Sequence, residues 1–333
     1  MKILILGGTG FLGKYLVREL AINASKIYVV CRNKHKNTFQ EFTNIEMVTG
    51  DITDTEVIKD SHIKNAILSD CDVIIHAAAL YDVKAAYQEI YLHNVVGTQN
   101  VLQLLKKTKN LKAFYYVSTI AVADEQSECL TEDCLPIRTV FHDNYSKTKY
   151  YAEKLVREYA ATHPQLPIRI VRPGVIVGDS VTGEIANVNG PYYFLQFLKK
   201  YDHLIKKIPI MPMTFNPNSH LHIIPVDHAA HYIFLLINRD LYDEQLKTYH
   251  LICIDPPKIS QFLDDISRTL GLETQFQPIP SNKVFSFIMP FLKIPKEIIP
   301  FMFSRISYDK TLTLKDLPEL KNSKYADFKK IFS

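Results

Sequence analysis

Residues 2–13 read KILILGGTGFLG, a short apolar run that leads directly into closely spaced glycines. Lys2–Leu6 has the length and aliphatic content of a buried strand, and an amphipathic stretch (Leu12–Ile22) follows the glycines. The glycines themselves have the spacing G-x-x-G-x-x-G. A strand, a glycine turn and a helix N-terminus in this order form a site for the pyrophosphate of a dinucleotide. In this turn we expect nucleotide contacts from Gly7, Thr9, Gly10, Phe11, Leu12 and Gly13.

The overall composition is that of an ordinary globular protein, with 47% hydrophobic and 22% charged residues. The net charge is only +4 and no dense basic run occurs, so we expect no nucleic-acid partner. The five cysteines are scattered and lack histidines at zinc-site spacing, which indicates reduced thiols and no metal site. The N-terminal apolar run is too short for a signal peptide, and no run approaches the roughly 20 apolar residues that span a bilayer. We therefore expect a cytoplasmic protein.

The first two thirds of the chain alternate short β-branched runs with longer amphipathic stretches. Near-continuous apolar strands separated by helices indicate a parallel sheet that is covered on both faces. The predicted fold class is therefore α/β, a doubly wound (Rossmann) sheet with a smaller C-terminal substrate-binding part. The predicted helices include Tyr87–Lys107 and Tyr145–Ala161. The predicted strands are Lys2–Leu6, Lys26–Cys31, Ile45–Val48, Asp72–His76, Ala113–Val117 and Ile168–Val171.

Beyond about Gly178 the rhythm of strands and helices is interrupted, and residues 179–222 are richer in proline, asparagine and glycine. We predict that residues 1–178, rejoined by residues 223–253, form the dinucleotide-binding domain. Residues 179–222 and 254–333 are predicted to form the substrate-binding cap.

The ends of the second and third strands bear on which dinucleotide is bound. Arg32, rather than an acidic residue, follows the second strand, and a nearby arginine accommodates the 2′-phosphate of NADP(H). Lys34 and Lys36 would add positive charge, although an exposed basic loop would look the same. NADP(H) is therefore the preferred cofactor and NAD(H) the alternative. Asp51, followed by Ile52, offers a carboxylate to the adenine amino group after the third strand.

The fourth strand ends in HAAA, residues 76–79. The small residues Ala77, Ala78 and Ala79 allow the backbone to come close to a cofactor. A single histidine at a strand end is more often structural than basic in catalysis, and we interpret His76 in that way.

Further short segments follow along the chain: NVVGT (94–98), YVST (116–119), YSKTK (145–149) and RPG (172–174). Together with GGTGFLG, GDI and HAAA, in this order, they resemble the extended short-chain dehydrogenase/reductase family. The resemblance implies an NAD(P)-dependent oxidoreductase that uses a Ser or Thr, a Tyr and a Lys.

Hydride delivery to a carbonyl carbon builds negative charge on the oxygen, which then needs a proton donor and a second hydrogen bond. By the resemblance, Tyr145 is the donor and Lys149 lowers the pKa of its phenol. Thr119 supplies the second hydrogen bond, with Ser118 as the alternative because successive strand residues point to opposite faces. The cofactor-binding residues implied by the resemblance also include Asn94, which would order a proton-relay water, Tyr145, Lys149, Pro173, Gly174 and Val175.

The pattern Tyr-x-x-x-Lys occurs a second time, at Tyr150 and Lys154. Five residues correspond to about 140° around a helix, so the two pairs cannot face one nicotinamide. We expect the second pair to lie on the helix surface or in a dimer contact.

A narrower resemblance involves RPGVIVGDSVTGEIANVNGPYYFL (172–195), IIPVDHAAHYIFLL (223–236) and TYHLICIDPP (248–257). Together with HAAALYD (76–82), these segments resemble the thioester-reductase, or male-sterility-type, branch, above all the reductase domain of bacterial fatty acyl-CoA reductases. This resemblance implies that NADPH reduces an acyl thioester through a hemithioacetal to an aldehyde. The alternatives are an epimerase/dehydratase, a hydroxysteroid-type dehydrogenase or, as a non-enzyme, an NADP(H)-sensing or assembly protein.

The partners follow from this branch. Many such reductases carry further domains that these 333 residues lack, so we expect free acyl-CoA or a separate acyl carrier protein to bring the lipid-like substrate. A homodimer is expected by analogy. Asp227, in PVDH, either belongs to a family motif or caps a helix.

Residues 284–303 are strongly apolar but interrupted by three prolines, so they cannot cross a membrane as one helix. They either pack as core, line an acyl-chain site or make a peripheral membrane contact. The acyl-lining candidates are Phe194, Phe197, Phe285 and Phe291.

Overall fold

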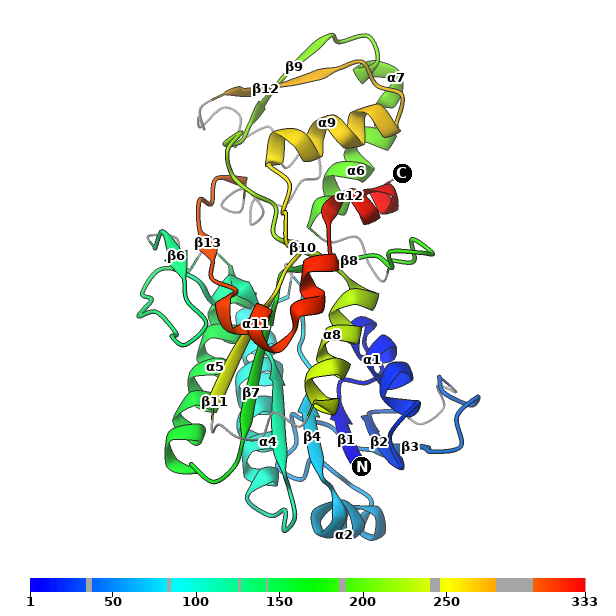
Figure 1. Cartoon of the computed structure of the whole chain (residues 1–333), viewed down its shortest axis with the longest axis vertical. Coiled ribbons are helices and arrows are strands. Elements are labelled where there is room, and N and C mark those ends of the chain that lie inside the picture. The colour runs from blue at the N-terminus through cyan, green and yellow to red at the C-terminus, as the bar shows by residue number, and fades with distance from the viewer. Residues whose placement is uncertain are drawn as a thin grey trace.

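The computed structural model describes residues 1–33, 38–82, 85–124, 127–141, 143–185, 190–239, 246–279 and 302–332. Its centre is a seven-stranded sheet with the order β11-β7-β5-β4-β1-β2-β3, in which every neighbouring pair is parallel (Figure 1). The strand order reverses between β1 and β4, which is where doubly wound sheets bind their ligands. The predicted fold class is thus confirmed. The strands are β1 (Lys2–Leu6), β2 (Lys26–Cys31), β3 (Ile45–Thr49), β4 (Val73–His76), β5 (Ala113–Val117), β7 (Ile168–Pro173) and β11 (Leu246–Leu251).

Helices cover both faces of the sheet, and β1 shows why. Its Ile3 and Ile5 join the apolar cluster on the face covered by α1 and α8, whereas Leu4 and Leu6 join the cluster under α4 and α5. Alternate strand residues point to opposite faces, so a continuous apolar strand needs a cover on both sides. The covering helices are α1 (Phe11–Ala21), α8 (Val226–Asn238), α2 (Ser61–Asp70), α4 (Gly97–Leu105) and α5 (Asn144–Thr162).

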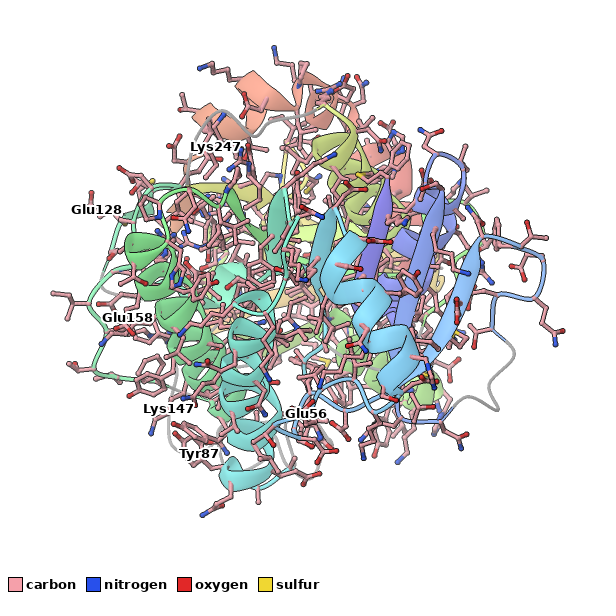
Figure 2. All side chains as sticks on the ribbon, turned by 90° about the horizontal axis from the view of Figure 1, so that it is seen from below. Glu56, Tyr87, Glu128, Lys147, Glu158 and Lys247 are labelled. Carbon is pink, nitrogen blue, oxygen red and sulfur yellow. The ribbon has the colours of Figure 1, made fainter. Side chains whose placement is uncertain are left out.

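The predicted helix Tyr87–Lys107 contains an irregular turn that the sequence did not indicate. It consists of α3 (Tyr87–Tyr91), a π-helical turn η1 (Leu92–Val96) and α4 in direct succession. Such π-turns often occur at functional sites, and this one contains a predicted cofactor residue. The N-terminal end of α5 lies beside α3, where Lys147 Nζ stands 4.7 Å from the ring centre of Tyr87 (Figure 2).

A smaller part, the cap, lies beyond the carboxyl end of the sheet (Figure 1). Its two strands pair in parallel and its helices enclose a separate apolar cluster. Phe194 and Phe197, two of the acyl-lining candidates, are buried in this cluster. Phe285 and Phe291 lie outside the described residues, as do Lys34 and Lys36. The cap elements are α6 (Pro191–Lys200), α7 (Asp202–Ile205), β9 (Ile210–Thr214), α9 (Ile259–Thr269), β12 (Gln275–Ile279), α12 (Tyr325–Phe328) and η6 (Lys329–Phe332).

Short elements connect the cap to the sheet. Leu317 and Leu320, which the predicted division assigns to the cap, pack into the cluster that includes α1 and α8. Two pairs of short parallel strands, β8 with β10 and β6 with β13, join segments that are distant in sequence. The elements are η2 (Ile120–Val122), β6 (Cys129–Leu130), β8 (Val175–Val177), β10 (Ile223–Pro225), β13 (Ser307–Tyr308), α11 (Thr311–Asp316) and η5 (Pro318–Asn322).

Within the described ranges, none of the helices has both the length and the apolar character needed to cross a membrane.

Candidate active site

The glycine turn is shaped so that only glycine fits at two of its positions. Gly7 has a φ of 88°, and a Cβ there would lie 2.4 Å from the backbone nitrogen of Ala78. A Cβ at Gly13 would lie 2.1 Å from the carbonyl oxygen of Gly7. Helix α1 starts after Gly10 without a side-chain cap and without an acidic residue in its first turn. Its N-terminal N–H groups and its dipole are thus available to an anion, and this turn fits a dinucleotide pyrophosphate.

The other predicted cofactor residues line the same carboxyl edge of the sheet. Arg32 is exposed directly after β2. The Asp51 carboxylate accepts hydrogen bonds from the backbone N–H and the hydroxyl of Thr53, both at 2.9 Å. Ile52 is buried against Gly97, and Ala77 N donates to Leu6 O at 2.9 Å. Their contacts with a nucleotide stay predictions.

The turn after β7 is tied to the segment that enters β10. Gly174 N donates to Leu251 O, and Val175 N donates to His222 O, both at 2.9 Å. A Cβ at Gly174 would lie 2.5 Å from the same His222 oxygen, so the close approach of the two segments requires glycine. Pro173, Gly174 and Val175 are therefore held rigidly at the carboxyl edge.

Tyr145 stands in the first turn of α5. Asp143 caps this helix by accepting a hydrogen bond from Ser146 N at 2.7 Å. The ring of Tyr81 packs edge-on against that of Tyr145, with 4.6 Å between the ring centres. Burial, with smaller contributions from Tyr81 and Asp143, raises the pKa of the Tyr145 phenol. A neutral phenol in this position can act as a proton donor.

Lys149 lies one turn further along α5 and is buried. Its Nζ donates to the Tyr116 hydroxyl at 2.9 Å and to Val117 O at 2.7 Å. An ammonium group has three N–H donors, so these two bonds leave one for a ligand. Burial lowers the pKa of Lys149 to about 7, and the Glu153 carboxylate opposes this shift.

Ser118 and Thr119, the two hydroxyl residues after β5, have different hydrogen-bond partners. Ser118 Oγ donates to Glu153 Oε2 at 2.6 Å in the interior. Thr119 Oγ1 accepts a hydrogen bond from Ala121 N at 3.2 Å, which leaves its own hydroxyl proton for another acceptor. This difference favours Thr119 over Ser118 as the hydroxyl that contacts a substrate.

Asn94 and His76 are both bound within the protein. Asn94 Oδ1 accepts from Leu80 N at 2.7 Å, and its Nδ2 donates to Leu80 O and to Thr148 Oγ1. Asn94 thus fastens the segment after β4 to α5, and its proton-relay role stays a prediction. His76 is fully buried, with Nε2 3.0 Å from Thr98 Oγ1, and burial lowers its pKa to about 3. This burial supports the structural interpretation of His76, which stays a prediction.

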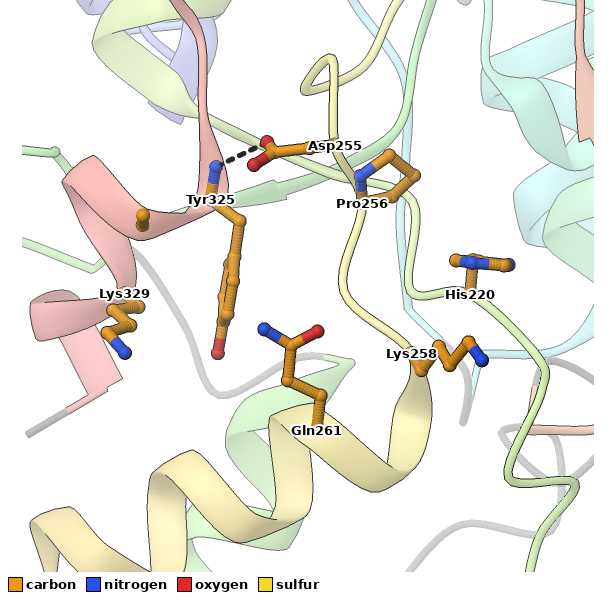
Figure 3. Close-up of a pocket in the computed structure, with 8 residues that line it drawn as sticks. His220, Asp255, Pro256, Lys258, Gln261, Tyr325 and Lys329 are labelled. Carbon is orange, nitrogen blue, oxygen red and sulfur yellow. Dashed lines mark hydrogen bonds between the residues drawn. The ribbon is translucent and has the colours of Figure 1, made fainter.

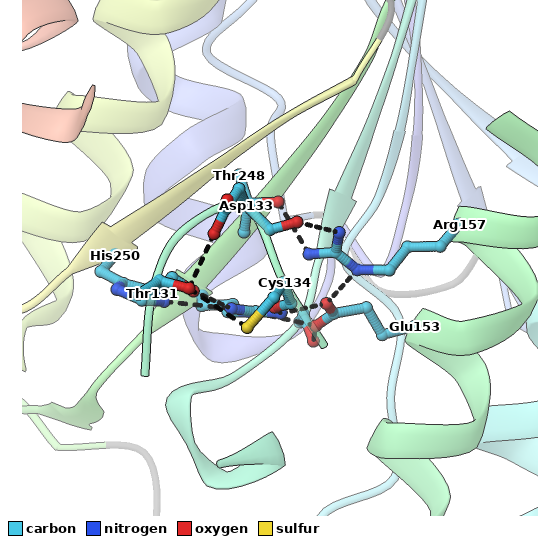
Figure 4. Close-up of polar contacts among 9 residues, drawn as sticks. Thr131, Asp133, Cys134, Glu153, Arg157, Thr248 and His250 are labelled. Atoms are coloured by element: carbon cyan, nitrogen blue, oxygen red, sulfur yellow. Dashed lines mark hydrogen bonds and ion pairs between the residues drawn. The ribbon is translucent and has the colours of Figure 1, made fainter. Parts of the chain in front are cut away.

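A buried cluster of charged side chains, which sequence reasoning missed, supports this site (Figure 4). Glu153 accepts hydrogen bonds from Arg172, Arg157 and Ser118, and Arg172 also contacts His250 Nε2 at 3.2 Å. Burial alone would raise the pKa of the Glu153 carboxyl, but the adjacent Arg172 and Arg157 lower it to about 2. The available signal was the pair Arg169 and Arg172 in an otherwise apolar strand, because a buried charge needs a partner.

Two interpretations from the sequence need correction. Tyr150 is not helix surface: it is buried and packs against Phe141, with 5.3 Å between the ring centres. Asp227 does not cap α8, whose N-cap position is Pro225. The Asp227 carboxylate instead accepts hydrogen bonds from the backbone N–H of Ser180 at 2.9 Å and from its hydroxyl at 2.5 Å. It therefore anchors the loop that leads into the cap.

The doubly wound sheet and its glycine turn define a dinucleotide-binding fold of the extended short-chain dehydrogenase/reductase type. The family model described as Male sterility protein, an NAD-binding family, matches residues 5–233, which is more than half of the chain. The chain belongs to this family.

Three comparisons describe its relatives. The fatty acyl-CoA reductase wat of Drosophila melanogaster is 25% identical, over 68% of this chain and 52% of that protein. The carboxylic acid reductase of Segniliparus rugosus is 26% identical, over 70% of this chain and 23% of that protein. The crystal structure of the terminal R domain from the myxalamid PKS-NRPS biosynthetic pathway has the same fold, with a TM-score of 0.75 and 24% identity. That match covers 97% of this chain and 86% of the R domain. The chain therefore spans about half or less of the two enzymes.

Proposed function

We propose that the chain is an NADPH-dependent reductase that converts a fatty acyl thioester to the aldehyde. One observation carries this proposal. Tyr145 and Lys149 on α5, and Thr119 directly after β5, lie at the carboxyl edge of the sheet, where the glycine turn also lies. The likeness to a fatty acyl-CoA reductase and a carboxylic acid reductase supports an acyl substrate. Arg32, exposed after β2, supports the preference for NADPH.

NADPH, when bound, supplies the hydride that reaches the thioester carbon. The Tyr145 phenol donates its proton to the carbonyl oxygen, and the Thr119 hydroxyl donates a second hydrogen bond to it. The ammonium group of Lys149 stabilises the phenolate that Tyr145 becomes. The product of this step is a hemithioacetal. Its hydroxyl proton returns to Tyr145 as the carbon–sulfur bond breaks, which gives the aldehyde and a thiolate, and the thiolate takes up a proton from solvent to become the free thiol.

The thiol that leaves belongs to CoA or to the phosphopantetheine of a carrier protein. The buried Glu153–Arg172 ion pair holds α5 to β7. Tyr145 and Lys149, both on α5, therefore keep their positions relative to the sheet during the reaction. Pre-positioned hydrogen-bond donors need no reorganisation during the reaction, which favours the charged transition state.

The proposal is tested by incubating the protein with NADPH and a series of acyl-CoAs, and by following the loss of nicotinamide absorbance. We expect turnover with a maximum at one range of chain lengths, and a lower rate with NADH. An epimerase would show no net consumption of nicotinamide, and a sensor would bind NADPH without turnover. No oxidation of NADPH with any acyl thioester or matching aldehyde would contradict the proposal.

A further inference from the structure

A cleft in the cap has charged groups that are paired within the protein. It has a volume of about 300 Å³ and lies between the start of α9 and α12 (Figure 3). Asp255, in its lining, accepts a hydrogen bond from Tyr325 N at 2.7 Å. Lys329, also in the lining, forms an ion pair with Asp265 at 3.5 Å, and the same carboxylate lies close to the Tyr325 phenol. These contacts join the region of α9 to the C-terminal end of the chain, and none of them involves a residue of the predicted active site.

A different set of buried polar groups lies next to Lys149. Tyr116 of β5 is in register with His76 of β4, Thr98 stands on α4 and Lys149 on α5. All four side chains are buried, and they meet on the face of the sheet that α4 and α5 cover. We call these four residues the Tyr116 network.

Hydrogen bonds connect the Tyr116 network in series. Lys149 Nζ donates to the Tyr116 hydroxyl at 2.9 Å. The Tyr116 hydroxyl is also hydrogen-bonded to Thr98, and Thr98 Oγ1 lies 3.0 Å from His76 Nε2. The Thr98 hydroxyl donates its own proton to the carbonyl oxygen of Asn94 at 2.6 Å. The network therefore ends at the backbone of the π-helical turn η1.

The number of available protons fixes the direction of each bond. A threonine hydroxyl has one proton and two lone pairs. Thr98 gives its proton to Asn94 O, so it accepts from both Tyr116 and His76. Burial, and to a lesser extent the charge of Lys149, lowers the pKa of His76 to about 3, so its ring is neutral and its one N–H is on Nε2. His76 Nδ1 is then a bare nitrogen, which agrees with its lack of a hydrogen-bond partner among the described residues.

The phenol of Tyr116 consequently presents a lone pair to Lys149. Burial raises the pKa of this phenol, so it stays neutral, and its proton is directed to Thr98. A hydrogen bond that is accepted from an ammonium group favours the charged form of that group. Tyr116 and Val117 O together take two of the three N–H groups of Lys149, so the direction of the third N–H is fixed.

The titratable groups around Lys149 come from three elements. Glu153 and Tyr145 flank it on α5, Tyr116 lies on β5 and His76 on β4. The Glu153 carboxylate is charged and favours the ammonium form. Tyr116, Tyr145 and His76 are neutral at neutral pH, because burial disfavours their charged forms. Of these neutral groups, Tyr116 is the one that accepts a hydrogen bond from Lys149.

We propose that Tyr116, held by Thr98 and His76, is a positioning residue that aims the Lys149 ammonium group and keeps its proton in place before the cofactor binds. This inference rests on the proposed function, in which Lys149 stabilises the phenolate of Tyr145. Only the ammonium form of a lysine stabilises a phenolate by its charge. Tyr116 therefore keeps Lys149 competent at pH values at which burial would otherwise remove its proton.

The test is an NMR titration of the nucleotide-free protein with ¹³C at the Cε atoms of its lysines. The Lys149 signal is identified by its absence from Lys149→Met. Tyr116→Phe keeps the ring, whose centre lies 4.4 Å from Lys149 Nζ, and removes only the hydroxyl. We expect the pKa of Lys149 to be lower by about 1 in Tyr116→Phe, a tenfold change in the protonation equilibrium, because hydrogen bonds to charged groups are strong.

Variants of Thr98 test whether the whole network acts on Lys149. Thr98→Val keeps the shape but removes the acceptor of the Tyr116 proton, so the phenol can turn and donate to the neutral amine. We expect the pKa of Lys149 to fall by about 0.5 or more in Thr98→Val, and to stay at the wild-type value in Thr98→Ser, which keeps the hydroxyl. Tyr115→Phe is the matched control. It removes a buried hydroxyl that donates to Leu236 O at 3.2 Å on the opposite face of the same strand, and it should leave the pKa of Lys149 unchanged.

The inference is overturned if the pKa of Lys149 is the same in Tyr116→Phe as in the wild type, or the same in Thr98→Val as in Thr98→Ser. In the reductase assay, kcat should fall as the pH rises through the pKa of Lys149, and in Tyr116→Phe this fall should occur at a lower pH. The titration requires no turnover. A lowered pKa in Tyr116→Phe, without reduction of any acyl thioester by the wild type, would overturn the proposed function and leave the Tyr116 network in place.

Discussion

Tyr145 and Lys149 occupy consecutive turns of α5, yet burial acts on them in opposite directions. Burial disfavours the charged form of each group, so it keeps the phenol protonated and lowers the pKa of the lysine to about 7. Without a cofactor, Lys149 is therefore close to the midpoint of its titration at neutral pH. The Glu153 carboxylate, one turn further on, is the group that favours its charged form.

Tyr145→Phe removes the proton donor and leaves the ring that packs against Tyr81. We expect kcat for the reduction to fall by about 10²- to 10⁴-fold, with little change in nucleotide affinity. Steady-state kinetics together with nucleotide titration measure both. Tyr150→Phe, in the second Tyr-x-x-x-Lys pair, is the control and should keep kcat within about twofold. Equal losses in the two variants would contradict the assigned roles.

The lowered pKa of Lys149 predicts a pH dependence of stability in the nucleotide-free protein. Between pH 7 and its ordinary pKa of 10.5, the unfolded chain holds a proton on this lysine that the folded chain has lost. The free energy of unfolding should therefore rise with pH in this window, by at most about 1.4 kcal/mol per pH unit from this group. Urea unfolding at pH 7, 8 and 9 measures this rise.

The comparison with variants isolates the lysine. Lys149→Met should lose this part of the rise, whereas Lys154→Met, at an exposed position of the same helix, should keep it. If the free energy of unfolding of Lys149→Met rose with pH as steeply as that of the wild type, a group other than Lys149 would cause the rise.

At the scale of elements, the site depends on how α5 is joined to β5 and β7. Glu153 bonds to Ser118 after β5 and to Arg172 in β7, and all three side chains are buried. Because Ser118 is held inward, the next residue of the extended backbone, Thr119, projects to the other side. The charged cluster thus fixes the orientation of the predicted catalytic hydroxyl.

Glu153→Gln leaves Arg172 buried without a negative partner. We expect the free energy of unfolding to fall by about 3–5 kcal/mol, as for other broken buried pairs. Urea denaturation monitored by circular dichroism measures the change. Glu158→Gln, which removes an exposed carboxylate 3.9 Å from Lys154 on the same helix, should change stability by less than about 1 kcal/mol. A loss of similar size in both variants would count against a buried network.

Sequence patterns predicted the long elements well and the short contacts poorly. The strand Lys26–Cys31 has the predicted bounds, because a run of six residues carries a clear apolar pattern. Strands β6 and β13 contain two residues each, too few for any periodicity, and their pairing joins segments far apart in sequence. The burial of Tyr150 was missed for a related reason: its partner, Phe141, lies in the loop before the helix rather than on it.

At the scale of the whole molecule, the cap and the sheet meet at the carboxyl ends of the strands, where β8 and β10 pair (Figure 1). The glycine turn and the Tyr-Lys pair lie at that edge, on the side of the sheet.

Cofactor preference can be measured on the folded protein as a whole. A ligand that binds only the folded state stabilises it, by about 2.7 kcal/mol at 100 times its Kd. We expect NADPH to raise the melting temperature more than NADH at equal concentration, and Arg32→Ala to remove most of the difference. Arg268→Ala, an exposed arginine of α9, is the control. If NADPH and NADH raised the melting temperature of the wild type equally, the proposed role of Arg32 in binding the 2′-phosphate would be wrong.

The central claim is that hydride reaches a thioester carbon and that the thiol then leaves. The most direct measurement is product analysis after reaction of the protein with NADPH carrying deuterium at the transferred position and a long-chain acyl-CoA. We predict equal amounts of NADP⁺, free CoA thiol and aldehyde, with one deuterium at the aldehyde carbon. Thiol release without NADPH oxidation, or aldehyde without deuterium, would contradict the account.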